Sequence, residues 1–596
     1  MRRPTARAVK FIRRHQLAVG LSTAGVLLLS SLSIFLAWQS AAITRERNAA
    51  VEARDQAQIA QRAEEQVVSF LTELFDNADP TRNNGEDISA RDVVAAGAEK
   101  VHDLVESDPA LGGRLSLVLA QVHDELGLYD ETSLLFEQAA LALQELPKPD
   151  HRLVSRALRG QAGAFVRLGK MDQAEALLER AIDEARLSGS QHDLAASFGS
   201  RGFLAQYRQN FEVCIEFYRQ AILLQEKLTT VEGRENHIKS LLSLGACLDL
   251  SGQDEPAEQA LLKAIALVEA GPQEFQYLGA FAQNNLGGFY SDRGEAAAAY
   301  EALESSAKTF EKVYGPHHEN TATVLMILAS MDGEQGRYLE AIANSEKALR
   351  SLVKTAGQRN SNAINPHCNL GVYYPTIGDN DKSEKITLEC FEAAKEVLGP
   401  HARKTVDAQL ILSELRIARG QTQGLSAALR KLKKAEDPGT PWTEEQKFWY
   451  RRLECGLRLQ DRAVDEASAS CATFLELTSA VSDAGSARVF RSQLYLLELR
   501  LLQTDLSGAR SLENELVVSA KSLGDSLLPE SHCRFARLRG DLAAALEEPV
   551  EAETHYRHAL STGRAAGLLN THADMSRALD GLNRLALQDS AGPASN

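Results

Sequence analysis

The sequence lacks the short motifs that usually mark an enzyme active site. Its 596 residues contain no G-x-x-x-x-G-K-[ST] phosphate loop, no G-x-S-x-G elbow, no H-E-x-x-H motif and no C-x-x-C pair. Aromatic residues make up only 6% of the chain and proline occupies 16 positions. This composition favours an all-α protein, and the missing motifs predict a non-enzyme that needs no cofactor or metal. An enzyme of another kind stays open as an alternative, which a turnover assay would test.

Cysteine is scarce and its pattern suggests no disulfide framework. The seven cysteines are odd in number and widely scattered, so at least one would be unpaired in an oxidising compartment. We interpret them as buried thiols that pack as small hydrophobic side chains. They are Cys214, Cys247, Cys368, Cys390, Cys455, Cys471 and Cys533.

Histidine pairs also give no convincing metal site. His317 and His318 lie two repeats away from His401, so we expect all three in solvated turns, roughly 20 Å apart at usual helix-packing distances. His555 and His558 share one helix face and could contact zinc, but no third ligand is in view.

Charge is distributed unevenly along the chain. The formal net charge is −16, yet residues 1–38 carry six basic residues and no acidic one. The remainder is therefore strongly acidic, which argues against non-specific nucleic-acid binding because that requires basic surfaces.

A turn motif recurs with a period close to 42 residues. Most copies begin with a small residue, usually glycine, and have another small residue five positions later. The first positions are Gly127, Gly169, Gln209, Gly252, Gly294, Gly336, Gly378 and Gly420, and less clearly Arg462, Thr504 and Glu547. So regular a period predicts a solenoid of stacked units, in which an extended surface carries the function.

One copy shows the physical logic of the unit. The segment from Gly336 to Ala341 joins two stretches with helical apolar spacing. Glycine at the corner supplies the positive φ that ends the first helix. The small residue five positions on, represented by Ala257, Ala299 and Ala341, lets the two helices pack closely.

This pattern resembles the tetratricopeptide repeat, a helix–turn–helix unit whose minimal length is 34 residues. The longer period is similar to the variant with extended helices found in kinesin light chain and in many bacterial signalling proteins. The resemblance covers roughly Leu111 to Met575 and weakens from Arg462 onward. It implies a right-handed all-α solenoid of about 10–11 units.

The resemblance also implies a binding face on the first helices of the repeats. Asn285 and Asn369 lie nine positions before a corner glycine, where an asparagine of the family often bonds the backbone of a bound peptide. Alternatively, both bond the backbone of a neighbouring repeat. Further candidates on this face are Lys239, Asn284, Ser291, Asp292, Thr323, Met326 and Ser330.

The N-terminus contains one long uncharged run. Leu17 to Trp38 is 22 residues without a charge, follows a basic segment and is long enough to cross a bilayer. The positive-inside rule then predicts a single-pass membrane protein with a cytoplasmic N-terminus and a periplasmic or extracytoplasmic array. A cleaved signal peptide and a buried core helix are the alternatives.

An Ala-, Arg- and Glu-rich segment, Ile43 to Asn77, separates this run from the repeats. It predicts a helical stalk that either pairs as a coiled coil in a homodimer or packs its far end on the array. We therefore expect seven segments: a basic tail (1–16), a transmembrane helix (17–38), a stalk (39–78), a linker with a capping helix (79–110), a regular array (111–440), degenerate repeats (441–588) and a disordered tail (589–596).

This order resembles the C-terminal half of bacterial membrane-bound serine/threonine kinases that carry tetratricopeptide repeats. The glycine-rich loop, strand lysine, H-R-D loop and D-F-G site of a kinase are all absent. The resemblance implies a non-catalytic scaffold or sensor that binds protein or peptide and works beside a cytoplasmic kinase. A purely structural envelope scaffold and a fragment of a full-length receptor kinase are the alternatives.

Overall fold

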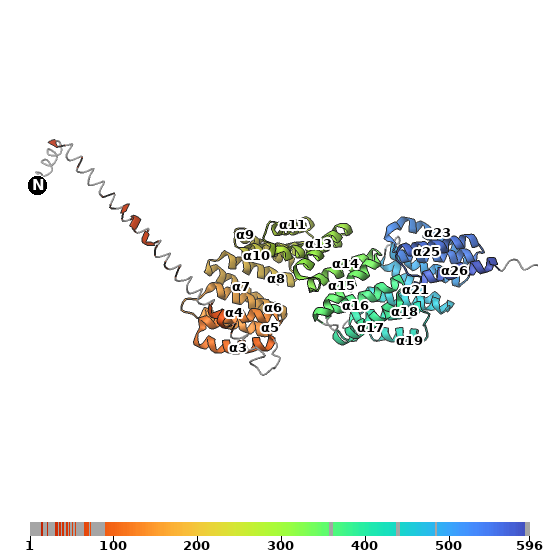
Figure 1. Cartoon of the computed structure of the whole chain (residues 1–596), viewed down its shortest axis with the longest axis horizontal. Helices are drawn as coiled ribbons and strands as arrows, with labels where there is room; N and C mark the ends of the chain where they lie inside the picture. Colours follow the sequence, from red (N-terminus) through yellow and green to blue (C-terminus); the bar gives the residue numbers. More distant parts are fainter. Residues whose placement is uncertain are drawn as a thin grey trace, which may run out of the picture. The chain divides into compact units, whose positions relative to one another are not determined.

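The structure is a computed structural model that describes residues 90–356, 361–436, 441–482 and 486–590, with scattered residues between 14 and 72. All regular elements in these ranges are helical. The chain divides into two compact units, and the boundary falls between His237 and Ile238, inside α10 (Val231–Leu250). Figure 1 shows the labelled helices of each unit, with consecutive helices side by side.

The first unit contains α3 (Ala90–Ser107), α4 (Pro109–Glu125), α5 (Tyr129–Gln144), α6 (His151–Arg167), α7 (Met171–Ser188), α8 (Gln191–Tyr207) and α9 (Phe211–Gln225). The second contains α11 (Asp254–Glu269), η1 (Gln273–Phe275), α12 (Gln276–Asp292), α13 (Ala296–Tyr314), α14 (Glu319–Glu334), α15 (Tyr338–Ala356), α16 (Ser361–Ile377), α17 (Asn380–Val397), α18 (Arg403–Ala418), α19 (Leu425–Lys434), α20 (Glu444–Gln460), α21 (Val464–Val481), α22 (Ala487–Leu502), α23 (Leu506–Leu523), η2 (Gly524–Ser526), α24 (Pro529–Ala545), α25 (Pro549–Ala565) and α26 (Ala573–Ser590).

The predicted corners are where helices end. All eleven predicted corner positions have a positive φ, between 53° at Arg462 and 91° at Gly378. Gln209, Arg462, Thr504 and Glu547 adopt this left-handed conformation without being glycine, although it costs an L-residue about 1–2 kcal/mol. The repeat therefore continues through the degenerate C-terminal copies, where the corner glycine has been replaced but its backbone conformation has not.

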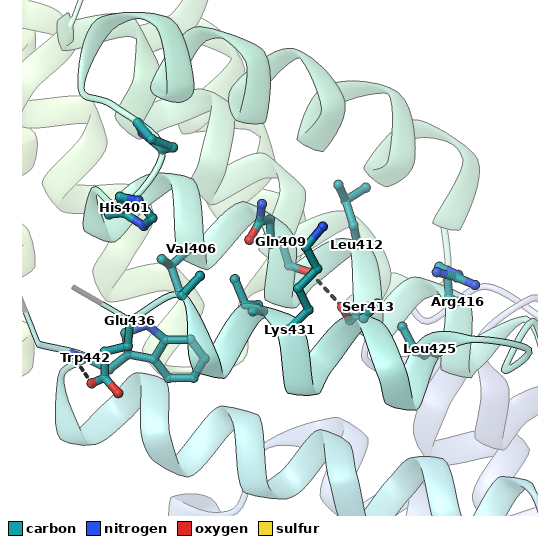
Figure 2. A pocket seen from close by; sticks show the side chains of 14 residues that line it. His401, Val406, Gln409, Leu412, Ser413, Arg416, Leu425, Lys431, Glu436 and Trp442 are labelled. Carbon is teal, nitrogen blue, oxygen red and sulfur yellow. Dashed lines mark hydrogen bonds between the residues drawn. The ribbon is translucent and has the colours of Figure 1, made fainter.

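The position five after each corner is buried in every repeat. Ten of these residues are small and fully buried: Thr132, Ala174, Cys214, Ala257, Ala299, Ala341, Ser383, Ala467, Ala509 and Ala552. The exception is Leu425, which is also buried. It begins the ten-residue α19, shorter than the other α-helices of the structure. Figure 2 shows the space between α18 and α19 that this repeat leaves open.

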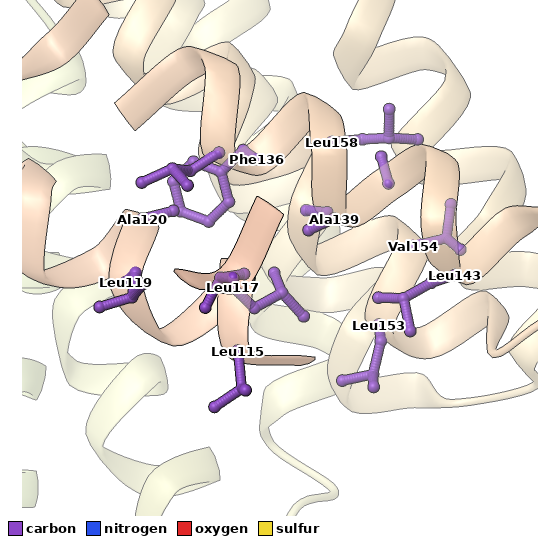
Figure 3. Packing of buried hydrophobic residues seen from close by; sticks show 14 of the residues in the cluster. Leu115, Leu117, Leu119, Ala120, Phe136, Ala139, Leu143, Leu153, Val154 and Leu158 are labelled. Carbon is purple, nitrogen blue, oxygen red and sulfur yellow. The ribbon is translucent and has the colours of Figure 1, made fainter. Parts of the chain in front are cut away.

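The core of the first unit is an apolar cluster shared by α4, α5 and α6. Figure 3 shows leucine, alanine and phenylalanine side chains of these helices facing one another. Phe136 lies where a Cβ on Gly160 would collide with its ring. Val67 and Phe70 also pack against this cluster, which agrees with the alternative in which the far end of the stalk packs on the array.

In the second unit, the C-terminal repeats contact corners that lie about 190 residues earlier. The Tyr338 hydroxyl donates to Glu530 Oε2 over 2.6 Å. The Leu569 N–H donates to the Ile377 carbonyl over 2.6 Å, and the Thr571 hydroxyl donates to the Gly378 carbonyl over 2.7 Å. We call these three contacts the C-terminal clasp.

Two cysteine pairs overturn the interpretation of the cysteines as thiols. Cys368–Cys390 joins α16 to α17, and Cys455–Cys471 joins α20 to α21. Each disulfide therefore links the two helices of one repeat. The expected burial of these positions had suggested that the cysteines pack as small hydrophobic side chains. Cys214 and Cys247 are also disulfide-bonded, and Cys533 is a buried free thiol.

The prediction of a single-pass membrane protein with an extracytoplasmic array is corrected. Most of 17–38 and of the coiled-coil segment lies outside the described residues. Among the residues that the structure describes, no helix has the length and apolar character that crossing a membrane requires. The prediction rested on a lack of charge, and a span also needs a continuous apolar helix that satisfies its own backbone.

Candidate functional site

The structure places the predicted peptide-binding residues on the first helices of consecutive repeats in the second unit. Lys239 is on α10, Asn284, Asn285, Ser291 and Asp292 are on α12, Thr323, Met326 and Ser330 are on α14, and Asn369 is on α16.

Their side chains differ in how far they are already engaged. Asn285 and Asn369 are half-buried. The side-chain amide of neither residue forms a hydrogen bond within the described parts of the chain. Asn284 buries its Oδ1 without a hydrogen-bond partner. The Thr323 hydroxyl donates to the Glu319 carbonyl of its own helix over 3.0 Å, so this hydroxyl has an internal partner. The set therefore lies along one series of helices and is not gathered into one cluster.

The same helix face lines a cavity three repeats later. Trp449 lies 126 residues after Thr323, and Arg452 lies 126 residues after Met326, which is three periods of 42. Both border a cavity of about 380 Å³, which we call the inner cavity. Its wall consists of Val372, Glu414, Glu445, Phe448, Trp449, Arg452, Phe474, Arg491, Leu494, Tyr495, Glu530, Ser531, Arg534, His572 and Asp574.

Most charges in the inner cavity are already paired. Arg452 Nη2 lies 3.0 Å and 2.9 Å from the two carboxylate oxygens of Glu414, and the Trp449 indole N–H donates to the same carboxylate over 2.9 Å. Arg534 lies over the ring of Tyr495 at 3.8 Å. These contacts hold aromatic rings and guanidinium groups in fixed positions around the cavity.

Arg534 belongs to a buried charge network on Glu498. Its Nη2 lies 2.6 Å from Glu498 Oε2, while Arg577 and Arg537 approach the same carboxylate at 2.8 Å and 3.7 Å. Burial raises the pKa of Glu498, but the three arginines outweigh it and lower that pKa to about 2. Glu498 is therefore a carboxylate at neutral pH and ties α22, α24 and α26 together.

Arg491 differs from the other arginines of the inner cavity. It forms no ion pair or hydrogen bond within the described residues. Burial lowers its pKa, and the nearby charge of Glu530 opposes that shift. An arginine side chain nevertheless stays protonated in a protein, so Arg491 is a partly desolvated cation with open donors.

Glu530, whose charge acts on Arg491, belongs to the C-terminal clasp. Its Oε2 accepts the short hydrogen bond from Tyr338, which is itself deeply buried. Burial and the charge of Glu530 both raise the pKa of the Tyr338 hydroxyl, so it stays a donor. The clasp thus engages the acid whose charge acts on Arg491, while Arg491 lines the cavity.

Sequence reasoning selected the helix face that also lines the inner cavity, but it did not select the residues of the cavity itself. The candidates were chosen in the regular repeats, where asparagine matched the family pattern. The missed signal was the 42-residue register itself, because the positions of Thr323 and Met326 carry Trp449, Arg452 and Arg491 in later repeats. A concentration of arginine and tryptophan at two neighbouring register positions is typical of a binding surface.

Family comparison agrees with the helical pairs described above. A tetratricopeptide repeat model matches residues 114–185 and 280–352, which correspond to α4–α7 and α12–α15. The chain contains tetratricopeptide repeats. No curated protein matches the chain.

Several solved helical-repeat proteins are similar at low identity. BtubC (BKLC) from P. vanneervenii matches at 17% identity and a TM-score of 0.33, covering 41% of this chain and 94% of its own. A Rap protein complexed with competence and sporulation factor matches at 11% and 0.41, covering 62% and 98%. The apo quorum sensor NprR from B. thuringiensis matches at 11% and 0.37, covering 65% and 97%.

Proposed function

We propose that this chain is a non-catalytic scaffold that binds a segment of a partner protein, and that the inner cavity receives an acidic group of that segment. The observation that carries this proposal is Arg491, a cation with open donors among paired charges. The tetratricopeptide repeats support it, because such solenoids offer extended surfaces for partners.

The cavity has the size and chemistry that the proposal needs. A volume of about 380 Å³ falls within the usual range of ligand pockets, roughly 300–1,000 Å³. Arginine binds a carboxylate through two parallel N–H donors, and Trp449 and Tyr495 offer rigid aromatic walls. The acid enters as the partner of Arg491, and the apolar part of the segment packs on the rings.

Beyond the cavity, the segment extends along the first helices toward Asn369 and Asn285. Their half-buried amides are free to bond a peptide backbone. A signalling role beside a serine/threonine kinase is a finer form of the proposal, and its support is the N-terminal resemblance alone.

The test uses the full chain and a random peptide library displayed on phage. We expect enrichment of peptides that contain Asp or Glu, and about tenfold or greater weakening of the best peptide by Arg491→Gln. Arg500→Gln is the matched control, since Arg500 lies on the same helix α22, is outside the lining of the cavity and donates to the Gly508 carbonyl. Enriched peptides that bind Arg491→Gln as tightly as the unmodified chain would refute the proposal.

A further inference from the structure

The repeat formed by α18 and α19 contains a second cavity on a different side of α18. Glu414 of α18 faces the inner cavity, whereas Gln409 and Arg416 line a cavity of about 420 Å³ toward α19. At 100° per residue, these positions lie on largely opposite helix faces. We call this second cavity the wedge pocket (Figure 2).

The exceptional corner residue explains why the pocket exists. In the other repeats, a small residue five after the corner lets the two helices approach. Here Leu425 occupies that position, is itself buried and lines the pocket. Its larger side chain keeps α19 away from α18. This repeat therefore has a cavity between its two helices, whereas the two helices of the other repeats pack directly on each other.

The walls of the wedge pocket are mainly apolar. Val406 and Leu412 come from α18, Leu425 and Leu432 from α19, and Trp442 from the segment before α20. Figure 2 shows Trp442 at one end of the pocket and Arg416 at the other. Binding is favoured when an apolar ligand displaces water from such a wall, because apolar surface is then removed from water.

The charge around this pocket is basic, although the chain as a whole carries −16. The ten residues of α19 include four basic residues and no acidic one. Lys431 lines the pocket, is exposed and forms no ion pair or hydrogen bond among the described residues. Arg416 donates to the Gln423 carbonyl over 2.9 Å, and no carboxylate neutralises it within the described parts of the chain.

The acid at the other end of the pocket already has its partners. Lys433 donates to Glu436 over 2.5 Å, and the Trp442 backbone N–H donates to it over 2.8 Å. These two bonds lower the pKa of Glu436. The unmatched charge of the pocket is therefore positive and lies at Lys431 and Arg416.

We propose that the wedge pocket binds a small amphiphilic anion, a medium-chain carboxylate, with its tail along Leu412 and Trp442 and its carboxylate at Lys431 and Arg416. At about 30 Å³ per water-sized group, 420 Å³ holds roughly 14 non-hydrogen atoms. Dodecanoate has that size. The partly open space between two helices suits one small molecule, and the basic rim selects an anion.

Calorimetric titration of the full chain with dodecanoate, below the concentration at which it forms micelles, tests the proposal. We expect saturable binding of one molecule per chain and much weaker binding of the uncharged dodecanol. Lys431→Gln should weaken dodecanoate about tenfold. Lys434→Gln should leave it unchanged, because Lys434 lies on the same helix but outside the pocket.

A second pair of variants tests the location of the site. Ala428 is exposed and lines the pocket, whereas its neighbour Ala427 is exposed and does not. Ala428→Trp should fill the cavity and abolish binding, while Ala427→Trp should bind normally with the same thermal midpoint. Absence of saturable binding, equal affinity for dodecanol, or unchanged binding by Ala428→Trp would each overturn the proposal.

Discussion

Two corner glycines of the second unit allow the C-terminal clasp to be tested directly. Gly252 and Gly378 both have a positive φ, of 74° and 91°. A Cβ on Gly252 would meet nothing within 4 Å, whereas a Cβ on Gly378 would collide with the backbone of His572. Alanine at either position therefore has the same unfavourable backbone conformation, but only alanine at 378 also disturbs the clasp.

The magnitudes follow from this difference. An L-residue in the left-handed region destabilises the folded state by about 1–2 kcal/mol. Alanine also lowers the conformational entropy of the unfolded chain, which offsets about 0.4–1 kcal/mol of this cost. Gly252→Ala should therefore lower the free energy of unfolding by about 1 kcal/mol. Gly378→Ala adds an overlap of about 1–3 kcal/mol and disturbs the hydrogen bond from Thr571 to the Gly378 carbonyl. We expect a total near 3 kcal/mol.

Hydrogen exchange resolved by segment is the appropriate measurement, because a chain of two units need not unfold in one step. The Leu569 amide, which donates to Ile377, should exchange about 30-fold faster in Gly378→Ala than in Gly252→Ala, the factor that corresponds to about 2 kcal/mol. Equal exchange of this amide in both variants would show that the clasp does not stabilise the C-terminal repeats.

Three further predictions concern packing, cross-links and pH. Ala299→Trp should overpack its helix pair and cost about 1–3 kcal/mol in thermal unfolding, whereas Ala297→Trp, at an exposed position of the same helix, should have little effect; unchanged melting of both would contradict the assigned repeat register. Non-reducing peptide mapping should recover Cys368 joined to Cys390, and reduction should destabilise the second unit by about 2–4 kcal/mol; recovery of both residues as free thiols would refute the cross-link. The folded-state pKa of Glu498 is depressed to about 2 from 4.5, so the stability that this carboxylate contributes should be complete above pH 4.5 and lost between pH 4.5 and 2. Glu498→Gln should lower the thermal midpoint at neutral pH, and the midpoint of this variant should fall less steeply than that of the unmodified chain between pH 4.5 and 2.

How much could be predicted depended on the range of the interactions involved. The corners were readable because a repeat is a local unit, and even Thr504 and Glu547 were placed by spacing when composition argued against them. Spacing could not show that Cys368 meets Cys390, since both residues also fit the small buried positions of a helix pair. The uncharged run from Leu17 to Trp38 misled for a related reason, because lack of charge does not establish a membrane-spanning helix.

By itself, the sequence determined the all-α class, the 42-residue register, the left-handed corners and the helix face on which a partner is expected. These features repeat from unit to unit and depend on contacts within one helix pair. Only the tertiary structure decided which residues form the inner cavity, that Arg491 has no ion pair among the residues the structure describes, and that Gly378 meets Thr571. Those contacts join residues far apart in the chain, because small rotations from one repeat to the next add up and determine which surfaces meet.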